Sequence, residues 1–162
     1  MQPLVIAQML VLLLVANGTP VIATRLWGHL LSFPVDCGLS YFDGRRLLGP
    51  SKTIRGVVLS IIATSGCAPI VGLEWNIGAV VGSAAMAGDL FSSFVKRRMH
   101  LPASSRATGL DQIPESLFPL LSCRSLLAIT PADIVVGTVL FFIGELVLSR
   151  LLYKIRVRRQ PY

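Results

Sequence analysis

Five apolar segments, each close to the length of a membrane span, limit what this chain can fold into. They cover residues 4–23, 57–73, 77–95, 113–129 and 132–153, and hydrophobic residues make up 53% of the 162-residue sequence. A helix needs about 20 such residues to cross about 30 Å of hydrocarbon. The pattern predicts an all-α, multi-pass protein of the cell membrane, with about five transmembrane helices in a single domain over residues 1–162.

Two of the five segments have an alternative interpretation. The fourth is interrupted by Pro114, Pro119 and Arg124, so a re-entrant or half-buried helix is the alternative to a full span there. The first resembles a cleaved signal peptide in position, but no basic residue precedes Leu4 and the first cation is Arg25. A signal peptide carries its positive charge in front of the apolar run, so we expect the first segment to be a span.

The distribution of positive charge predicts the orientation of the chain. Of the 15 Lys and Arg residues, 14 lie in the loops at 24–56 and 96–112 or near the C-terminus, and Arg124 alone falls on the other side. Cytoplasmic loops carry such an excess, so we expect the N-terminus outside, the C-terminus in the cytoplasm and a functional site at the cytoplasmic face. Anionic lipid headgroups account for much of the net charge of +7, and nucleic acid is not an expected partner.

Acidic residues occur where the apolar segments meet the cytoplasmic face. Asp89 lies about 12 residues into the third segment, roughly 18 Å along a helix, and it shares a helix face with Ser93 and Lys96. Asp111 and Glu115 are four residues apart and enter the membrane from the same side. The three carboxylates are therefore expected to converge, and oxygen ligands of this kind suit Mg²⁺.

Each carboxylate also has a structural interpretation. Asp111 is in a position to cap a helix, Glu115 to pair with the dipole of a first helical turn, and Asp89 to pair with a neighbouring cation. Glu145, about 13 residues into the last segment, lies at nearly the depth of Asp89 by the same count. Glu145 either supports the residues that bind the metal or neutralises the charge of Arg150.

The loop at 24–56 contains a second group of candidate residues. Lys52, Thr53 and Arg55 follow flexible glycines at the start of the second span, which is a suitable place to bind a polyphosphate. Anchoring at the inner membrane surface explains the same cations equally well. Asp43-Gly44 is typical of a two-residue hairpin with a type I′ turn, in which both central residues have positive φ.

Several of these residues, taken in order, resemble the CDP-archaeol synthase family. The match consists of Pro34-x-Asp36, Asp43-Gly44-Arg45, Gly49-x-x-Lys52-Thr53-x-Arg55-Gly56, Gly88-Asp89 with Ser93 and Lys96-Arg97-Arg98, and Gly109-Leu110-Asp111-Gln112-x-Pro114-Glu115-Ser116. It covers nearly the whole chain. A more distant similarity is to phosphatidate cytidylyltransferases, through Ser93-Phe94-Val95-Lys96-Arg97.

The resemblance implies Mg²⁺-dependent transfer of a cytidylyl group from CTP to an anionic membrane lipid, with release of pyrophosphate. The lipid is either a phosphatidate or resembles 2,3-bis-O-geranylgeranyl-sn-glycerol 1-phosphate, and a homodimer is allowed. The expected metal ligands are Asp89, Asp111 and Glu115, which together with Lys52 form the catalytic set. The expected substrate-binding residues are Asp43, Lys52, Thr53, Arg55, Ser93, Lys96 and Arg97. A CTP-dependent lipid kinase and a non-catalytic transporter or assembly factor are the alternatives.

Overall fold

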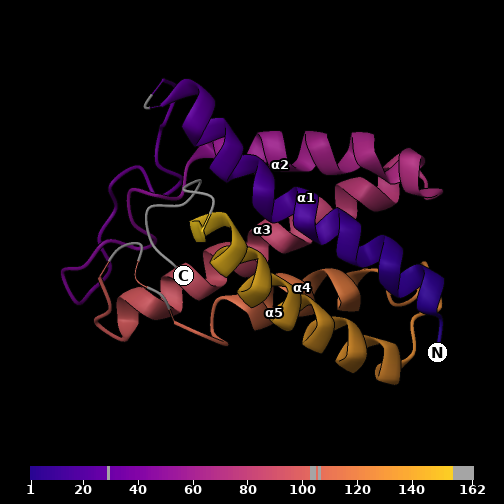
Figure 1. The fold of residues 1–162 in the computed structure, drawn as a ribbon. Coiled ribbons are helices and arrows are strands. Elements are labelled where there is room, and N and C mark those ends of the chain that lie inside the picture. The colour runs from indigo at the N-terminus through magenta and orange to yellow at the C-terminus, as the bar shows by residue number, and fades with distance from the viewer. Residues whose placement is uncertain (29, 103–104, 106, 155–162) are drawn as a thin grey trace.

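The computed structural model describes residues 1–28, 30–102, 105 and 107–154, and its regular elements there are helices, with two isolated β-bridges. The elements are α1 (Pro3–Trp27), α2 (Ile54–Cys67), the 3-10 turn η1 (Ala68–Val71), α3 (Trp75–Arg98), α4 (Gln112–Ser122) and α5 (Pro131–Lys154). Figure 1 shows them side by side in a bundle, with the α1–α2 and α3–α4 loops at the same end. The predicted all-α class is confirmed.

Four helical stretches are long and apolar enough to cross a membrane. They are Pro3–Trp27, Ile54–Val71, Trp75–Arg98 and Pro131–Arg150. Each coincides with a predicted span to within a few residues, and the chain is a multi-pass membrane protein.

The fourth apolar segment, residues 113–129, contains a helix shorter than a full span, as in the alternative of a half-buried helix. α4 has 11 residues, about 16 Å at 1.5 Å per residue, and turns follow it up to Ala128, which has a positive φ of 49°. Pro119 removes one backbone hydrogen bond from the last turn of α4. The helix and the turns together still lead to the end where α1 begins, because Gln2 Nε2 donates to the Ala128 carbonyl.

α3 lies against α2 on one side and against α4 on the other, and glycines make both contacts close. A Cβ atom on Gly78 would lie 2.5 Å from the Thr64 carbonyl oxygen of α2, and one on Gly88 would lie 2.3 Å from the Pro114 carbonyl oxygen of α4. Small residues allow this approach between helices, which is a main source of stability where water is absent. The contact at Gly88 determines how close Asp89 comes to α4.

α1 and α2 are joined by a hydrogen bond that compensates for a proline. Pro20 lies inside α1 and has no N–H to donate to the Ala16 carbonyl, four residues earlier. The buried Ser60 hydroxyl of α2 donates to that carbonyl instead, at 2.7 Å. Inside a membrane every backbone acceptor needs such a partner. The bond therefore compensates for the backbone hydrogen bond that Pro20 cannot make, and it fixes α2 beside the C-terminal half of α1.

Candidate active site

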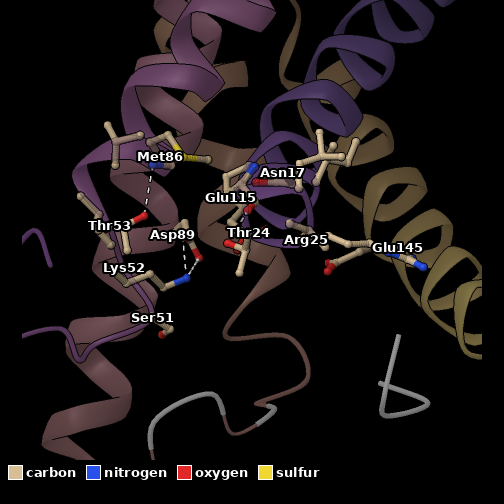
Figure 2. Close-up of a pocket in the computed structure, with 17 residues that line it drawn as sticks. Asn17, Thr24, Arg25, Ser51, Lys52, Thr53, Met86, Asp89, Glu115 and Glu145 are labelled. Atoms are coloured by element: carbon tan, nitrogen blue, oxygen red, sulfur yellow. Dashed lines mark hydrogen bonds and ion pairs between the residues drawn. The ribbon is translucent and has the colours of Figure 1, made fainter. Parts of the chain in front are cut away.

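A cavity of about 940 Å³ lies at the end of the bundle that carries the α1–α2 and α3–α4 loops, with walls from all five α-helices and the residues just before α2 (Figure 2). Its lining residues are Asn17, Pro20, Val21, Ile22, Thr24, Arg25, Leu26, Ser51, Lys52, Thr53, Gly56, Val57, Met86, Asp89, Leu90, Glu115 and Glu145. One part of this wall is charged and the other, mostly from α1, is apolar.

An ion pair crosses the charged part of the cavity. The Lys52 ammonium lies 2.6 Å from both carboxylate oxygens of Asp89. Lys52 comes from the loop before α2 and Asp89 from the middle of α3, and both side chains are about four-fifths buried. Thr53, the next residue, caps α2 by accepting a hydrogen bond from Gly56 N–H at 3.2 Å. The cap fixes where Lys52 enters the cavity.

Two further carboxylates face the same cavity. Glu115, in the first turn of α4, is 8% exposed and interacts directly with the Asp89 carboxylate and electrostatically with Glu145 of α5. Figure 2 shows Glu115 between Asp89 and Asn17. The structure therefore brings together Lys52, Asp89 and Glu115 of the predicted catalytic set, and it adds Glu145, whose place the sequence left open.

Asp111, the third predicted metal ligand, is absent from the lining of the cavity. Its carboxylate lies 2.7 Å from the Lys96 ammonium and accepts a hydrogen bond from Ala107 N–H. Asp111 has helical backbone angles (φ −76°, ψ −50°) and directly precedes α4, but these two contacts hold its carboxylate outside the cavity lining. Lys96 also donates to the Ser105 carbonyl, and the pair holds the loop between α3 and α4 against the end of α3.

The other predicted substrate-binding residues make contacts within the protein. Arg55 donates to the carbonyls of Gly28 and Leu30, Arg97 donates to the Pro102 carbonyl at 2.7 Å, and Ser93 is buried. Asp43 pairs with Arg98 at 2.7 Å. Their roles in substrate binding stay predictions; in this structure they connect the loops at 28–53 and 96–112 to the helices.

A buried carboxylate organises the loop before α2. Asp36 accepts hydrogen bonds from the N–H groups of Gly38, Leu48 and Gly49 and from Arg46, at 2.8–3.2 Å. Burial alone would raise the pKa of Asp36, but hydrogen bonds from these backbone groups and from Arg46 outweigh it and lower the pKa to about 2. Val35 N–H then donates to the Lys52 carbonyl, which links this loop to the cavity.

The turn at Asp43 differs from the predicted two-residue hairpin. Tyr41 N–H donates to the Arg45 carbonyl, Gly44 N–H donates to the Tyr41 carbonyl, and Gly44 has a φ of 72° while Asp43 is not among the residues with positive φ. This is a three-residue loop, in which a single glycine supplies the left-handed position. Asp43 contributes instead by accepting from Arg45 N–H.

Sequence reasoning missed Asn17, which lies in the cavity wall from the middle of α1. Among the residues that the structure describes, no partner reaches its buried Nδ2 atom. A buried donor without an acceptor costs about 1–3 kcal/mol, so a ligand that accepts a hydrogen bond there is expected. The signal was available, because an amide inside a membrane-length apolar run is unusual and often functional.

The residues present suit a divalent cation only in part. No group of three or more His, Cys, Asp or Glu side chains in the described ranges is arranged to hold a metal ion. Asp89 and Glu115 nevertheless offer adjacent carboxylate oxygens on an open cavity. Magnesium keeps several waters and is usually held by one or two carboxylates together with substrate phosphates, so two carboxylates suffice for that mode of binding.

Comparison with known proteins gives a consistent family. The model of the CarS-like CDP-archaeol synthase family matches residues 3–162. The chain is 33% identical over 159 residues to a CDP-archaeol synthase of Pyrobaculum arsenaticum, covering 91% of this chain and 92% of that protein. It is 43% identical over 86 residues to the CDP-archaeol synthase of Methanopyrus kandleri, about half of each chain.

A solved structure agrees with the sequence relatives. It belongs to an intramembrane enzyme for archaeal membrane lipid biosynthesis, and it superposes with a TM-score of 0.77 at 31% identity over 88% of this chain and 90% of that one. The order of motifs in the sequence, the helical fold and these relatives lead to one conclusion. The chain belongs to the CDP-archaeol synthase family.

Proposed function

We propose that this protein transfers a cytidylyl group from CTP to the phosphate of an archaeal ether lipid. An oxygen of the lipid phosphate attacks the α-phosphorus of CTP and forms a new P–O bond. The bond from the α-phosphorus to the bridging oxygen breaks, and pyrophosphate leaves with the electron pair. The products are a CDP-activated lipid and pyrophosphate, and no side-chain nucleophile is needed.

The observation that carries this proposal is the mixed character of the cavity. Lys52, Asp89 and Glu115 form its charged part, while Ile22 and Leu26 of α1 form an apolar part whose side chains are exposed. A reaction between a soluble triphosphate and a membrane lipid needs both kinds of surface at one place. Holding the two reactants in line supplies a large part of the rate acceleration.

Lys52 is suited to hold a phosphate without leaving Asp89. An ammonium group has three N–H donors, and the two oxygens of Asp89 engage two of them. The third donor remains for a phosphate oxygen, and Thr53 places it at the N-terminus of α2, where backbone N–H groups favour anions. Asp89 thereby orients the ammonium, and Lys52 neutralises charge on the nucleotide.

Mg²⁺ is the metal that we propose for this site, held by Asp89 and Glu115. When bound, it would shield the triphosphate and stabilise the charge on the departing pyrophosphate. Glu145 faces Glu115 across the cavity and adds to the negative potential that attracts a cation. We propose that Asp111 acts with Lys96 to fix the loop at 96–112 beside the cavity.

We further propose that the cavity faces the cytoplasm and that the N-terminus lies outside. In support, the α1–α2 and α3–α4 loops lie at the end of the bundle that contains the cavity. These loops and the helix ends beside them carry most of the Lys and Arg residues. The sequence argument also included four arginines that lie outside the described residues: Arg106, Arg156, Arg158 and Arg159. CTP is made and used in the cytoplasm, so this orientation agrees with the proposed reaction.

The experiment that tests this function follows the label of two radioactive nucleotides. Purified protein is reconstituted with Mg²⁺ and either α-³²P- or γ-³²P-CTP, and a geranylgeranylated glycerol-phosphate ether or a phosphatidate is offered as the acceptor. We expect label in the organic phase from α-labelled CTP only, and faster labelling of the ether lipid. Label from γ-labelled CTP would establish a lipid kinase, and no label from either nucleotide would refute both activities.

The geometry gives the kinase no support. A kinase must remove a proton from a lipid hydroxyl, and Asp89 is the carboxylate of the cavity beside Lys52 to which that role would fall. Asp89 is paired with Lys52, and we assign its carboxylate to Mg²⁺ and not to proton transfer. A lipid phosphate, ionised at neutral pH, needs no such base.

A further inference from the structure

A second cation lines the cavity and has no role in the mechanism described so far. In the described part of the chain, Lys52 and Arg25 are the basic residues of the cavity wall. Lys52 is engaged by Asp89. Arg25, in the last turn of α1, is exposed, and its guanidinium forms no ion pair with the described residues.

The neighbouring cations are already occupied. Arg55 is held by the carbonyls of Gly28 and Leu30, Lys96 by Asp111, Arg97 by the Pro102 carbonyl and Arg98 by Asp43. The reaction brings two anions together, and one ammonium cannot neutralise both. Of the two basic residues in the cavity wall, Arg25 is therefore the one that has no carboxylate partner in the part of the chain that the structure describes.

The surroundings of Arg25 indicate which anion this is. Val21, Ile22 and Leu26 lie on the same half of α1, line the cavity and are exposed, Ile22 to 59% and Leu26 to 68%. Because α1 is long and apolar enough to cross a membrane, we infer that exposed apolar side chains along it meet lipid. The apolar wall of the cavity is thus continuous with the surface of α1 that contacts the membrane, and Arg25 lies where this wall meets the charged part.

The position of α5 leaves this side of the cavity accessible. α1 and α5 are joined at the opposite end of the bundle, where Gln2 N–H donates to Asp133 at 3.0 Å. At the cavity end, Figure 2 shows Arg25 and Glu145 in the space between the two helices. A guanidinium has five N–H donors in a planar fork, so it is able to bind a phosphate in two-point fashion with a carboxylate nearby.

We propose that Arg25 binds the phosphate of the lipid substrate, and that Ile22 and Leu26 guide the adjoining alkyl chains along α1. This inference rests on the proposed cytidylyl transfer and names the lipid side of that site. Lys52 then serves the nucleotide and Arg25 serves the acceptor. The arrangement delivers the lipid phosphate from the membrane side, while CTP enters from the aqueous end.

The test compares Arg25→Gln and Arg25→Lys with a matched control. Arg124→Gln alters an exposed arginine near the opposite end of the bundle. We expect Arg25→Gln to raise the KM for the lipid phosphate at least about tenfold, the loss of one charged hydrogen-bonded contact. The affinity for CTP should stay within about twofold, Arg25→Lys should recover part of the loss, and Arg124→Gln should behave as wild type.

A second measurement does not depend on the variants being folded. Wild-type protein is treated with an arginine-directed dicarbonyl reagent, and the modification of Arg25 is measured by mass spectrometry of its peptide. We expect the lipid phosphate to protect Arg25, and the same ether lipid lacking its phosphate to give no protection.

Three results would overturn the inference. The first is an unchanged lipid KM in Arg25→Gln, together with equal modification of wild-type Arg25 by the dicarbonyl reagent in the presence of either lipid; Arg25 would then be a membrane anchor only. A selective loss of CTP affinity would assign it to the nucleotide. Protection by the neutral lipid would show that the phosphate is not what Arg25 contacts. Wild-type protein that labels no lipid at all would instead refute the proposed function.

Discussion

The ammonium of Lys52 lies 2.6 Å from each carboxylate oxygen of Asp89, although the two residues are 37 positions apart in the chain. The contact joins the loop before α2 to the middle of α3. It holds the Asp89 carboxylate in place beside Glu115. The pair is about four-fifths buried, so each partner depends on the other for compensation of its charge.

Replacing Lys52 by Met should remove nucleotide binding and turnover together. The methionine fills a similar volume but leaves Asp89 beside Glu115 without its cation. We expect kcat/KM to fall by about 10²–10³, as when a group that stabilises developing charge is lost. The measurement is transfer of α-³²P label into lipid together with direct titration of CTP. Wild-type CTP affinity in Lys52→Met would contradict a role on the triphosphate.

Glu115→Gln should abolish turnover and still leave a stable protein. The substitution removes one of three carboxylates that face each other across the cavity, so we expect an unfolding temperature, measured without metal, equal to or above that of wild type. Added Mg²⁺ should raise that temperature in wild type, because a ligand stabilises the state that binds it, and should have no effect on the variant.

Glu74→Gln is the control for this substitution, since Glu74 is an exposed acid at the start of α3, away from the cavity. It should keep both activity and the response to Mg²⁺. A Glu115→Gln protein that is still stabilised by Mg²⁺ and still active would exclude Glu115 as a metal ligand.

Gly88→Ala should separate α3 from α4 and so disturb the site through packing alone. Its Cβ atom would lie 2.3 Å from the Pro114 carbonyl oxygen and 2.9 Å from Glu115 Cα, both backbone atoms that cannot rotate away. Overpacking of this kind costs about 1–3 kcal/mol. We expect a lower unfolding temperature and lower activity, because Glu115 moves away from Asp89.

Gly66→Ala is the matched control for Gly88→Ala. Gly66 lies in α2, and an added Cβ atom there meets nothing within 4 Å. Because alanine favours helix, the control should be as stable as wild type or slightly more stable. Equal behaviour of the two variants would show that the close approach of α3 and α4 is unimportant.

The fold was predictable from the sequence where the signal was local. Apolar length gave four of the spans, and the reversal of direction at each loop placed Asp89 and Glu115 at the same end of the bundle. The sequence also placed Glu115 in the first turn of a helix, and it lies in the first turn of α4. The four-residue spacing from Asp111 to Glu115 does not bring the Asp111 carboxylate into the cavity lining, because that carboxylate pairs with Lys96 and accepts a hydrogen bond from Ala107 N–H.

The pairing of Lys52 with Asp89 was not predictable in this way. The residues between α1 and α2 have no regular structure beyond two bridges, and their course depends on contacts distant in sequence, such as those of Asp36 with Leu48 and Gly49. No periodicity reports such contacts. Asn17 was missed for the opposite reason, because the apolar pattern around it was strong enough to conceal one polar residue.

Asn17→Leu is the substitution that separates function from stability most clearly. The buried amide nitrogen of Asn17 has no acceptor among the described residues, so a leucine of similar size removes an uncompensated donor. The free energy of unfolding should stay the same or rise by about 1 kcal/mol. Activity should nevertheless fall at least about tenfold, because the donor is then unavailable to a substrate oxygen.

Thr19→Val provides the comparison, two residues along the same helix. The Thr19 hydroxyl donates to the Val15 carbonyl within α1, so its loss should leave activity within about twofold. Steady-state kinetics with each substrate varied would then show which one Asn17 contacts: a raised KM for CTP assigns the amide to the nucleotide, and a raised KM for lipid assigns it to the acceptor. If Asn17→Leu were both less stable and fully active, the amide would have a structural role only. The polar part of the cavity that contacts substrate would then not include Asn17.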